Sequence, residues 1–301
     1  LQPGDEVLVP AFTYISTVEV VALLGINPVL VDVTPDTFEL DLDSATERLT
    51  PKTKAIVPVH LFGQCTNMQA VLDFAKAHEL KVIEDTAQAV GATCQMSNGE
   101  WQHAGTIGDI GTISFYPSKN LGGYGDGGAL VTRNEDLAAR MRQIANHGQA
   151  ERYYFDRVGV NSRLDSLQAA VLDVKLAHLD EYVAARRQVA GRYDTAFAEV
   201  NAISTPVKAA YSTHVYHQYT IKVKDGRRDA LQAYLQEKGI PSVVFYPLAV
   251  HQQRAYAHLA TPGALPVSEQ LGQEVLSLPI HTELDHDQLD YICEHVVAFF
   301  K

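Results

Sequence analysis

Apolar runs of strand length alternate with helical stretches over the first 132 residues of the chain. The strand-like runs are EVLVPAF (6–12), NPVLVDV (27–33), KAIVPVHLF (54–62) and LKVIED (80–85), and the helical ones are ISTVEVVALLG (15–25) and NMQAVLDFAKAHE (67–79). Within the helical stretches apolar residues recur three and four positions apart. This order predicts βαβ units, and therefore a mostly parallel sheet with helices on both of its faces.

A smaller α/β region follows residue 200. Before it, residues 165–200 keep a helical period without proline, long enough for one helix that bridges two domains. Beyond it we expect a strand in HQYTIKV (217–223), a helix in RRDALQAYLQEKG (227–239), a strand in PSVVFYP (241–247) and a last helix over 287–300. The predicted organisation is a large domain (1–165), a connecting helix (166–200) and a small C-terminal domain (201–301).

Composition limits the kinds of partner that the protein can have. No apolar run approaches the ~20 residues that a transmembrane helix needs, and the formal net charge of −12 argues against nucleic acid as a general partner. The three cysteines, Cys65, Cys94 and Cys293, are widely spaced and lack a C-x-x-C pair, which favours reduced thiols over a disulfide or a metal site. We therefore expect a soluble cytoplasmic protein that binds neither membrane nor nucleic acid, although a few local donors could still hold a small anion.

The stretch SFYPSKNLGGYGDGG (114–128) places Lys119 directly before a glycine-rich loop. Its glycines satisfy the G-x-G-x-x-G spacing, but the loop leads into the strand-like ALVT (129–132) rather than into the helix that a dinucleotide site needs. A Walker-type phosphate loop is excluded too, because its lysine follows the glycines. What remains is a reactive lysine beside a bare backbone that a flat ligand can approach closely.

Polar residues gather just after the predicted strands, where ligands bind in sheets of this kind. They are Asp85 and Gln88 in VIEDTAQAVGA, Ser114 in SFYPSKN and Tyr14 in PAFTYIST. Taken alone, each has an ordinary explanation as a helix N-cap, a loop polar group or a packing aromatic. Together with Lys119 they fit pyridoxal 5'-phosphate, which needs a lysine for covalent attachment, a carboxylate at its pyridine nitrogen, an aromatic ring against its face and donors for its phosphate.

Five segments resemble the DegT/DnrJ/EryC1/StrS family of sugar aminotransferases. They are PAFTYIST, VPVHLFGQ, VIEDTAQAVGA, GTIGDIGTISFYPSKNLGGYGDGGALVT and VGVNSRLDSLQAAVLDVKL. The resemblance covers essentially the whole chain and implies the aspartate-aminotransferase fold of type I pyridoxal phosphate enzymes. It also implies transfer of an amino group from L-glutamate to a nucleotide-linked keto sugar, for lipopolysaccharide or O-antigen biosynthesis. Lys119 agrees with transamination, since family dehydratases carry a histidine in its place.

The resemblance assigns a role to each candidate residue. Lys119 would bind the cofactor covalently and move the proton, and Asp85 would pair with the pyridine nitrogen. Gln88 would hydrogen-bond the phenolic oxygen, while Tyr14 stacks on the ring and Ser114 contacts the phosphate. No metal is implied.

The phosphate site is expected to need more than these residues. In family members an asparagine at the position of Asn161 reaches the phosphate of the neighbouring subunit's cofactor, which implies a homodimer with shared sites. Family members also begin earlier, with a helix, a strand and a Ser-Gly-Thr turn that cradles the phosphate. Either this segment has been omitted from the present chain or the protein is truncated with an incomplete phosphate site, and we expect omission because the other site residues are all present.

The substrate is narrowed by four blocks, SFYPSKNLGGYGDGG, HGQAERYYFDRVGVNSRLD, FYPLAVHQQRAY and LSLPI. They resemble enzymes that aminate UDP-2-acetamido-3-oxo-glucuronate, with dTDP-3-keto-6-deoxyhexose enzymes next and 4-keto sugars as a further alternative. In the uronate enzymes an arginine at the position of Arg163 meets the sugar carboxylate, which suits a planar guanidinium. A structural salt bridge is the other explanation for Arg163. Phe245 departs from the pattern, because FYP stands where HYP is usual.

Two further classes of function stay open. One is another type I enzyme, such as an aldolase or a desulfurase, although a desulfurase needs a mobile cysteine and none lies in the glycine-rich loop. The other is a non-enzymatic regulator that binds pyridoxal phosphate. A regulator of DNA would need a basic DNA-binding module, and the acidic chain shows no such segment.

Overall fold

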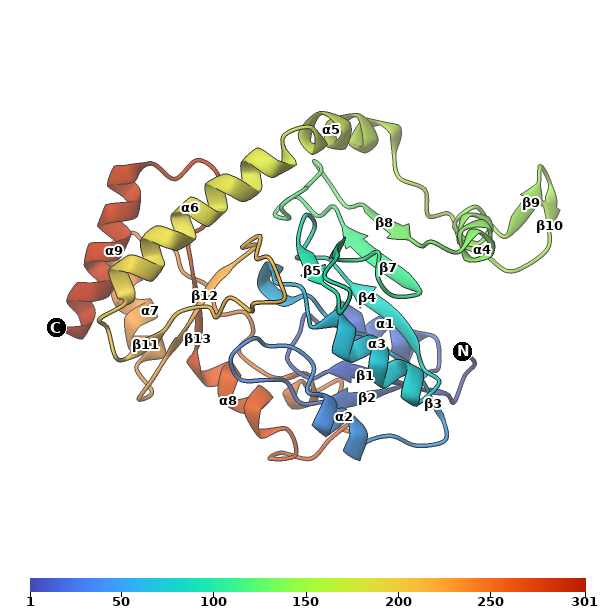
Figure 1. Ribbon diagram of the computed structural model, residues 1–301, viewed down its shortest axis with the longest axis horizontal. Helices are drawn as coiled ribbons and strands as arrows, with labels where there is room; N and C mark the ends of the chain where they lie inside the picture. Colours follow the sequence, from blue (N-terminus) through green and yellow to red (C-terminus); the bar gives the residue numbers. More distant parts are fainter.

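The computed structural model describes all residues, 1–301, and is built around two separate sheets (Figure 1). The larger sheet has the strand order β2-β1-β3-β4-β7-β8. Its strands are β1 (Glu6–Pro10), β2 (Asn27–Val31), β3 (Thr53–Ile56), β4 (Lys81–Asp85), β7 (Ile110–Ser114) and β8 (Gly128–Val131). All neighbours pair in parallel except β8, which runs antiparallel to β7 at the edge. The prediction of a mostly parallel sheet is confirmed.

Helices α1 (Ser16–Leu23) and α3 (Met68–Ala77) cover opposite faces of this sheet. Val7 and Val9 of β1 belong to the same buried cluster as Val18 of α1. Leu8 belongs instead to the buried cluster that contains Val71 of α3. Because side chains alternate along a strand, the two clusters lie on opposite faces of the sheet. The predicted βαβ organisation is therefore present, with a short helix α2 (Leu42–Glu47) added between β2 and β3.

The second sheet is smaller and antiparallel, with the order β11-β12-β13. Its strands are β11 (Ile203–Ser204), β12 (Tyr219–Val223) and β13 (Val275–Leu278), and helices α7 (Arg228–Glu237) and α9 (His286–Phe300) pack with them in a core of their own. The prediction of a strand over 241–247 is wrong, because that segment makes only an isolated bridge from Val243 to Ser277. Proline at both ends of PSVVFYP removes backbone donors that a paired strand needs.

The predicted single helix over 165–200 is two helices, α5 (Ser166–Leu176) and α6 (Leu179–Phe197), which Figure 1 draws along different directions. The chain leaves helical geometry at His178, with φ −109° and ψ 7°. Helix α6 alone makes the expected bridge, since Val183 packs in the core of the larger sheet and Val189 in that of the smaller one. The domain boundaries at 165 and 200 stay a prediction.

Residues 135–165 form an extended segment, called the arm below, that reaches away from both sheets in Figure 1. The arm contains α4 (Glu135–Ala145), β9 (Gln149–Glu151) and β10 (Tyr154–Phe155), and no residue of α4 is buried. Several of its large apolar side chains are exposed to solvent, most of all Val158, which is 96% exposed. Apolar exposure of this extent is typical of an interaction surface.

The remaining elements are short connections around the two sheets. They are the 3-10 turns η1 (Leu61–Gly63) and η2 (Val250–Gln252), the hairpin strands β5 (Thr93–Gln95) and β6 (Trp101–His103), and helix α8 (Pro266–Glu274). None of the helices is long and apolar enough to span a membrane.

Candidate active site

A cavity of about 560 Å³ opens at the carboxyl ends of the parallel strands. Tyr14, Gln88 and Ser114 line it, and they follow or end β1, β4 and β7 respectively. Parallel strands end at the same edge of a sheet, so three segments far apart in the sequence converge here. On the side of the smaller sheet, the cavity is lined by His217 and Tyr246.

Lys119 lines this cavity from the loop between β7 and β8. Burial lowers the pKa of its amine, while the nearby carboxylate of Asp85 acts to raise that pKa. A lysine with a lowered pKa is uncharged more of the time, which makes its nitrogen a better nucleophile. The next residue, Asn120, fixes the loop, since its side-chain amide donates to Val215 O at 2.9 Å.

The glycines after Lys119 allow close packing rather than phosphate binding. A Cβ at Gly122 would stand 2.4 Å from Pro117 O. Gln168 of α5 accepts a hydrogen bond from Tyr124 N at 2.7 Å, so the glycine loop rests on α5. As the sequence predicts, the loop continues into a strand, β8.

Asp85 ends β4, and both of its carboxylate oxygens are engaged. Thr17 Oγ1 donates to one oxygen at 2.6 Å, and Ala87 N donates to the other at 3.1 Å. No helix begins after Asp85, so the N-cap explanation does not apply. Thr17, in the first turn of α1, was not predicted. Thr17 belongs to the segment PAFTYIST, but its role depends on a contact with Asp85, which is 68 residues away in the sequence.

Asp85 also lines a second hollow of about 370 Å³ beside the first. The two hollows share Ser16, Ala87 and Ser114 in their walls. The amine of Lys119 and the carboxylate of Asp85 therefore approach the same region from neighbouring sides. The structure thus brings the two predicted residues to one region, and their roles stay a prediction.

Gln88 and two tyrosines form another part of the wall. Gln88 Oε1 accepts from Phe62 N at 2.7 Å, and its amide nitrogen donates to the phenol oxygen of Tyr246, Oη, at 3.0 Å. That nitrogen keeps one further N–H for a ligand. Burial raises the pKa of Tyr246, so its phenol stays protonated. The Tyr14 ring, 6.1 Å from the Tyr246 ring between centroids, is 57% exposed and can receive a flat ligand.

Ser114 is the remaining predicted residue in the cavity. Its hydroxyl oxygen accepts from Tyr116 N at 3.3 Å. Because this bond uses only a lone pair, the hydroxyl proton remains available to an anionic ligand.

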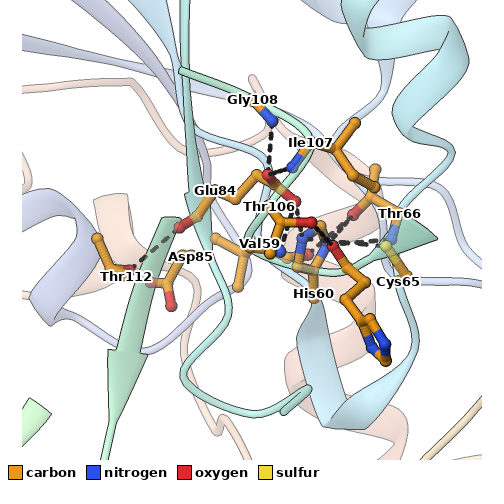
Figure 2. Close-up of polar contacts among 12 residues, drawn as sticks. Val59, His60, Cys65, Thr66, Glu84, Asp85, Thr106, Ile107, Gly108 and Thr112 are labelled. Carbon is orange, nitrogen blue, oxygen red and sulfur yellow. Dashed lines mark hydrogen bonds and ion pairs between the residues drawn. The ribbon is translucent and has the colours of Figure 1, made fainter. Parts of the chain in front are cut away.

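A buried network lies under Asp85 and is drawn in Figure 2. Glu84 accepts the backbone N–H groups of Ile107 and Gly108 at 2.7 and 2.6 Å, and its other oxygen is 2.9 Å from His60 Nε2. His60 Nδ1 accepts from Thr66 N at 3.1 Å, so the ring proton sits on Nε2 and points at Glu84. Burial acts to raise the pKa of Glu84, but His60 and the amides hold it below its usual range.

This network fixes the strand ends that carry the site. His60 N donates to Asp85 O at 3.0 Å, and the turn η1 begins one residue later. Phe62 in that turn supplies the N–H that orients Gln88. An ionised, fully hydrogen-bonded Glu84 therefore helps to hold both Asp85 and Gln88 in place.

The structure leaves two predicted residues outside the cavity. Asn161 and Arg163 are exposed on the arm, where Arg163 Nη2 donates to Asn161 Oδ1 at 3.0 Å. Asn161 also bridges to Asn146 within the arm. No acidic side chain pairs with Arg163, so the structural salt bridge is not found in this chain. Phe245, in contrast, lines the cavity itself.

Comparison with known proteins gives a consistent result. A model described as the DegT/DnrJ/EryC1/StrS aminotransferase family matches residues 1–297. The chain is 44% identical to a pleiotropic regulatory protein of Geobacillus stearothermophilus, over 99% of this chain and 79% of that protein. It is also 44% identical to the UDP-2-acetamido-2-deoxy-3-oxo-D-glucuronate aminotransferase of Pseudomonas aeruginosa, over 97% of this chain and 78% of that protein.

Solved structures agree with the fold. DesV of S. venezuelae, in complex with a ketimine intermediate, superposes with a TM-score of 0.95 at 39% identity, covering 100% of this chain and 80% of that one. Solved matches also include pyridoxal phosphate and pyridoxamine phosphate forms. The residues here fit such a cofactor, because a half-buried amine, a carboxylate, a free amide N–H and an open aromatic face surround the two hollows.

Proposed function

The chain belongs to the DegT/DnrJ/EryC1/StrS aminotransferase family, and we propose that it transfers an amino group from L-glutamate to UDP-2-acetamido-3-oxo-glucuronate. The enzyme class and the cofactor, pyridoxal 5'-phosphate, follow from that membership. The observation that carries the proposal is that Lys119 and Asp85 line two adjacent hollows that share wall residues. The Pseudomonas relative, named for the same sugar, supports the choice of substrate.

Lys119 and Asp85 divide the chemical work in this proposal. Pyridoxal phosphate, when bound, supplies an electron sink for the charge left at the reacting carbon after a proton is removed. Lys119 Nζ would hold the cofactor covalently, and as a free amine it would carry the proton removed from the α-carbon of the amino donor. Asp85 keeps a proton on the pyridine nitrogen, and Thr17 holds the Asp85 carboxylate in position.

The other residues bind and orient. Gln88 would use its remaining N–H for the phenolic oxygen of the cofactor, and Ser114 would donate its hydroxyl proton to the phosphate. Tyr14 would cover one face of the ring and keep water from it. Tyr246, protonated and hydrogen-bonded to Gln88, prevents that amide from turning away.

We further propose a homodimer in which each site takes residues from both chains. The arm carries exposed apolar side chains and ends near Asn161 and Arg163, neither of which lines the cavity of its own chain. A partner chain that covers the arm would bury this apolar surface. It would also place Asn161 beside the phosphate of the partner's cofactor.

Subunit mixing tests the shared site. Lys119→Ala and Asn161→Ala proteins are each expected to be nearly inactive, because one lacks the proton carrier and the other a phosphate ligand. After random exchange of equal amounts, about a quarter of all sites should contain both intact residues, so a similar fraction of turnover should return.

The control mixes Lys119→Ala with the double variant Lys119→Ala/Asn161→Ala, in which no site has both residues. Exchange itself is followed with differently tagged chains. Full exchange without recovered turnover would show that each site is built from one chain.

Specificity for the uronate depends on Arg163 and Phe245. Arg163 has no acidic partner in its own chain and can meet a C6 carboxylate in a bidentate pair. Phe245 places an apolar ring in the cavity wall, which would favour the methyl group of a dTDP-3-keto-6-deoxyhexose. The two residues favour different sugars, and the ratio of kcat/KM for the two sugars measures which preference prevails.

Arg163→Ala should lower kcat/KM for the uronate by roughly 10- to 100-fold, since a charge-assisted pair is worth about 1.5–3 kcal/mol. The 6-deoxy sugar has no carboxylate, so its kcat/KM should hardly change. Arg157→Ala, an exposed arginine of the same arm, is the matched control. If wild type prefers the 6-deoxy sugar and Arg163→Ala leaves the ratio of efficiencies unchanged, the uronate is the wrong substrate.

The cellular setting is part of the proposal. We infer that the enzyme works in the cytoplasm and supplies amino sugars for lipopolysaccharide or O-antigen. Its three cysteines are free and buried, which suits a reducing compartment. A purely regulatory role, suggested by the name of the Geobacillus relative, would leave the paired Lys119 and Asp85 without a use.

A further inference from the structure

His217 lines the cavity but takes no part in the roles assigned above. Its side chain is nearly buried, with 6% of the residue exposed. Nδ1 is sealed from solvent and has no hydrogen-bond partner. Nε2 has no partner in the protein either, but it is not sealed, so it is the ring nitrogen that a ligand in the cavity can reach.

The position of His217 is fixed by its backbone. A Cβ on Gly63 would lie 2.8 Å from His217 N, so the turn η1 presses directly against this segment. Gln218 N donates to Phe62 O at 3.2 Å, and buried Arg186 of α6 donates to Tyr216 O at 3.0 Å. Phe62 is also the residue that orients Gln88. The same rigid turn therefore places His217 and Gln88 relative to each other.

The ring of His217 is neutral at ordinary pH. Burial, then the positive charges of Lys119 and Arg186, hold its pKa well below the usual range. A neutral imidazole has one N–H, and with Nδ1 sealed, a ligand that accepts a hydrogen bond selects the form with the proton on Nε2. The buried guanidinium of Arg186, whose charge acts on the ring, also favours an anion in this part of the cavity.

We infer that His217 is a substrate-binding residue whose Nε2–H donates a hydrogen bond to the α-carboxylate of the amino donor. The inference rests on the proposed function, because it needs an amino acid as donor. In an amino acid the carboxylate is bonded directly to the reacting carbon, so its ligand must stand beside Lys119. The nucleotide of the second substrate is far from its reacting carbon and has no such requirement.

A packing role is the simpler explanation of a buried histidine, and the test must separate the two. His217→Leu removes the donor and keeps the volume, whereas His217→Gln keeps an N–H at a similar reach. His217→Phe, which keeps a planar ring, serves if the leucine variant does not fold. His258→Leu, at an exposed position outside the cavity, is the control.

Binding is measured by calorimetry on the holoenzyme with α-methyl-L-glutamate, which lacks the α-proton and cannot turn over. Its α-amide, which lacks the charged carboxylate, is measured in parallel. Wild type should bind the acid more tightly than the amide. His217→Leu or His217→Phe should weaken binding of the acid by roughly 10- to 100-fold with little effect on the amide. His217→Gln should restore most of the preference, and His258→Leu should behave as wild type.

An unchanged acid-to-amide ratio in His217→Leu or His217→Phe would overturn the inference. Weaker binding of the nucleotide sugar alone would overturn it as well, because His217 would then serve the acceptor. Failure of the proposed function would give a different experimental result. Wild-type enzyme that binds neither acid nor amide, and that shows no spectral change with L-glutamate, would contradict the donor assignment itself.

Discussion

Replacing Lys119 with alanine is expected to abolish transamination, with turnover lowered by roughly 10⁴-fold or more. The variant loses both the covalent attachment of the cofactor and the group that carries the proton. In the wild-type protein, burial lowers the pKa of the Lys119 amine, and this lowered pKa suits the amine to both tasks. Borohydride should fix the cofactor permanently on Lys119 in wild type, as a mass increase on that peptide. No mass increase should appear in the variant.

The matched control is Lys81→Ala, which removes a lysine whose side chain is 71% exposed and remote from the cavity. It should keep both turnover and the borohydride adduct. A Lys119→Ala protein that kept normal turnover and could still be trapped would show that another lysine is the reactive one.

Asp85→Asn is expected to retain cofactor and lose activity by roughly 10²-fold or more. Asparagine has nearly the same shape and can still accept the hydrogen bond from Thr17, but its neutral amide cannot hold a proton on the pyridine nitrogen. The electron sink is then weaker, while the fold is unchanged. Absorbance gives the cofactor content, and single-turnover kinetics with L-glutamate give the rate of the chemical step.

Thr17→Val separates charge from orientation. It keeps the Asp85 carboxylate but removes the 2.6 Å hydrogen bond that orients it, so its activity should lie between wild type and Asp85→Asn. Near-native turnover in Asp85→Asn would mean that Asp85 only supports the turn through Ala87.

Much of the large sheet could be predicted because its strands are buried on both faces. Such strands read as continuous apolar runs, and the helices between them keep their own period. The rule that ligands meet the carboxyl ends of strands then selected Asp85 and Ser114 without any knowledge of contacts. The strand that follows the glycine loop excluded a dinucleotide site, and Lys119 was therefore interpreted as a reactive lysine.

The errors have local physical causes. PSVVFYP has the composition of a strand, but its two prolines prevent regular pairing and the chain instead brings Tyr246 to the cavity. The break at His178 has no proline or glycine to mark it. Thr17 and His217 could not be found, because each acts through contacts with segments far away in the sequence.

Asn161 and Arg163 show a different limit. Sequence resemblance assigns them to a site, but a single chain holds them on the exposed arm, away from its own cavity. Their roles depend on how two chains associate. Subunit mixing addresses that question, and the other predictions do not depend on its result.

The central claim is that the protein moves an amino group between L-glutamate and a nucleotide-linked keto sugar, and heavy-nitrogen-labelled L-glutamate tests it most directly. Purified enzyme with pyridoxal phosphate is incubated with the labelled donor and UDP-2-acetamido-3-oxo-glucuronate, and the masses of the products are measured by mass spectrometry. The account predicts a UDP-linked amino sugar that carries the label, formed together with 2-oxoglutarate and absent with Lys119→Ala. Formation of 2-oxoglutarate without label in any nucleotide sugar offered, or no reaction with L-glutamate at all, would contradict it.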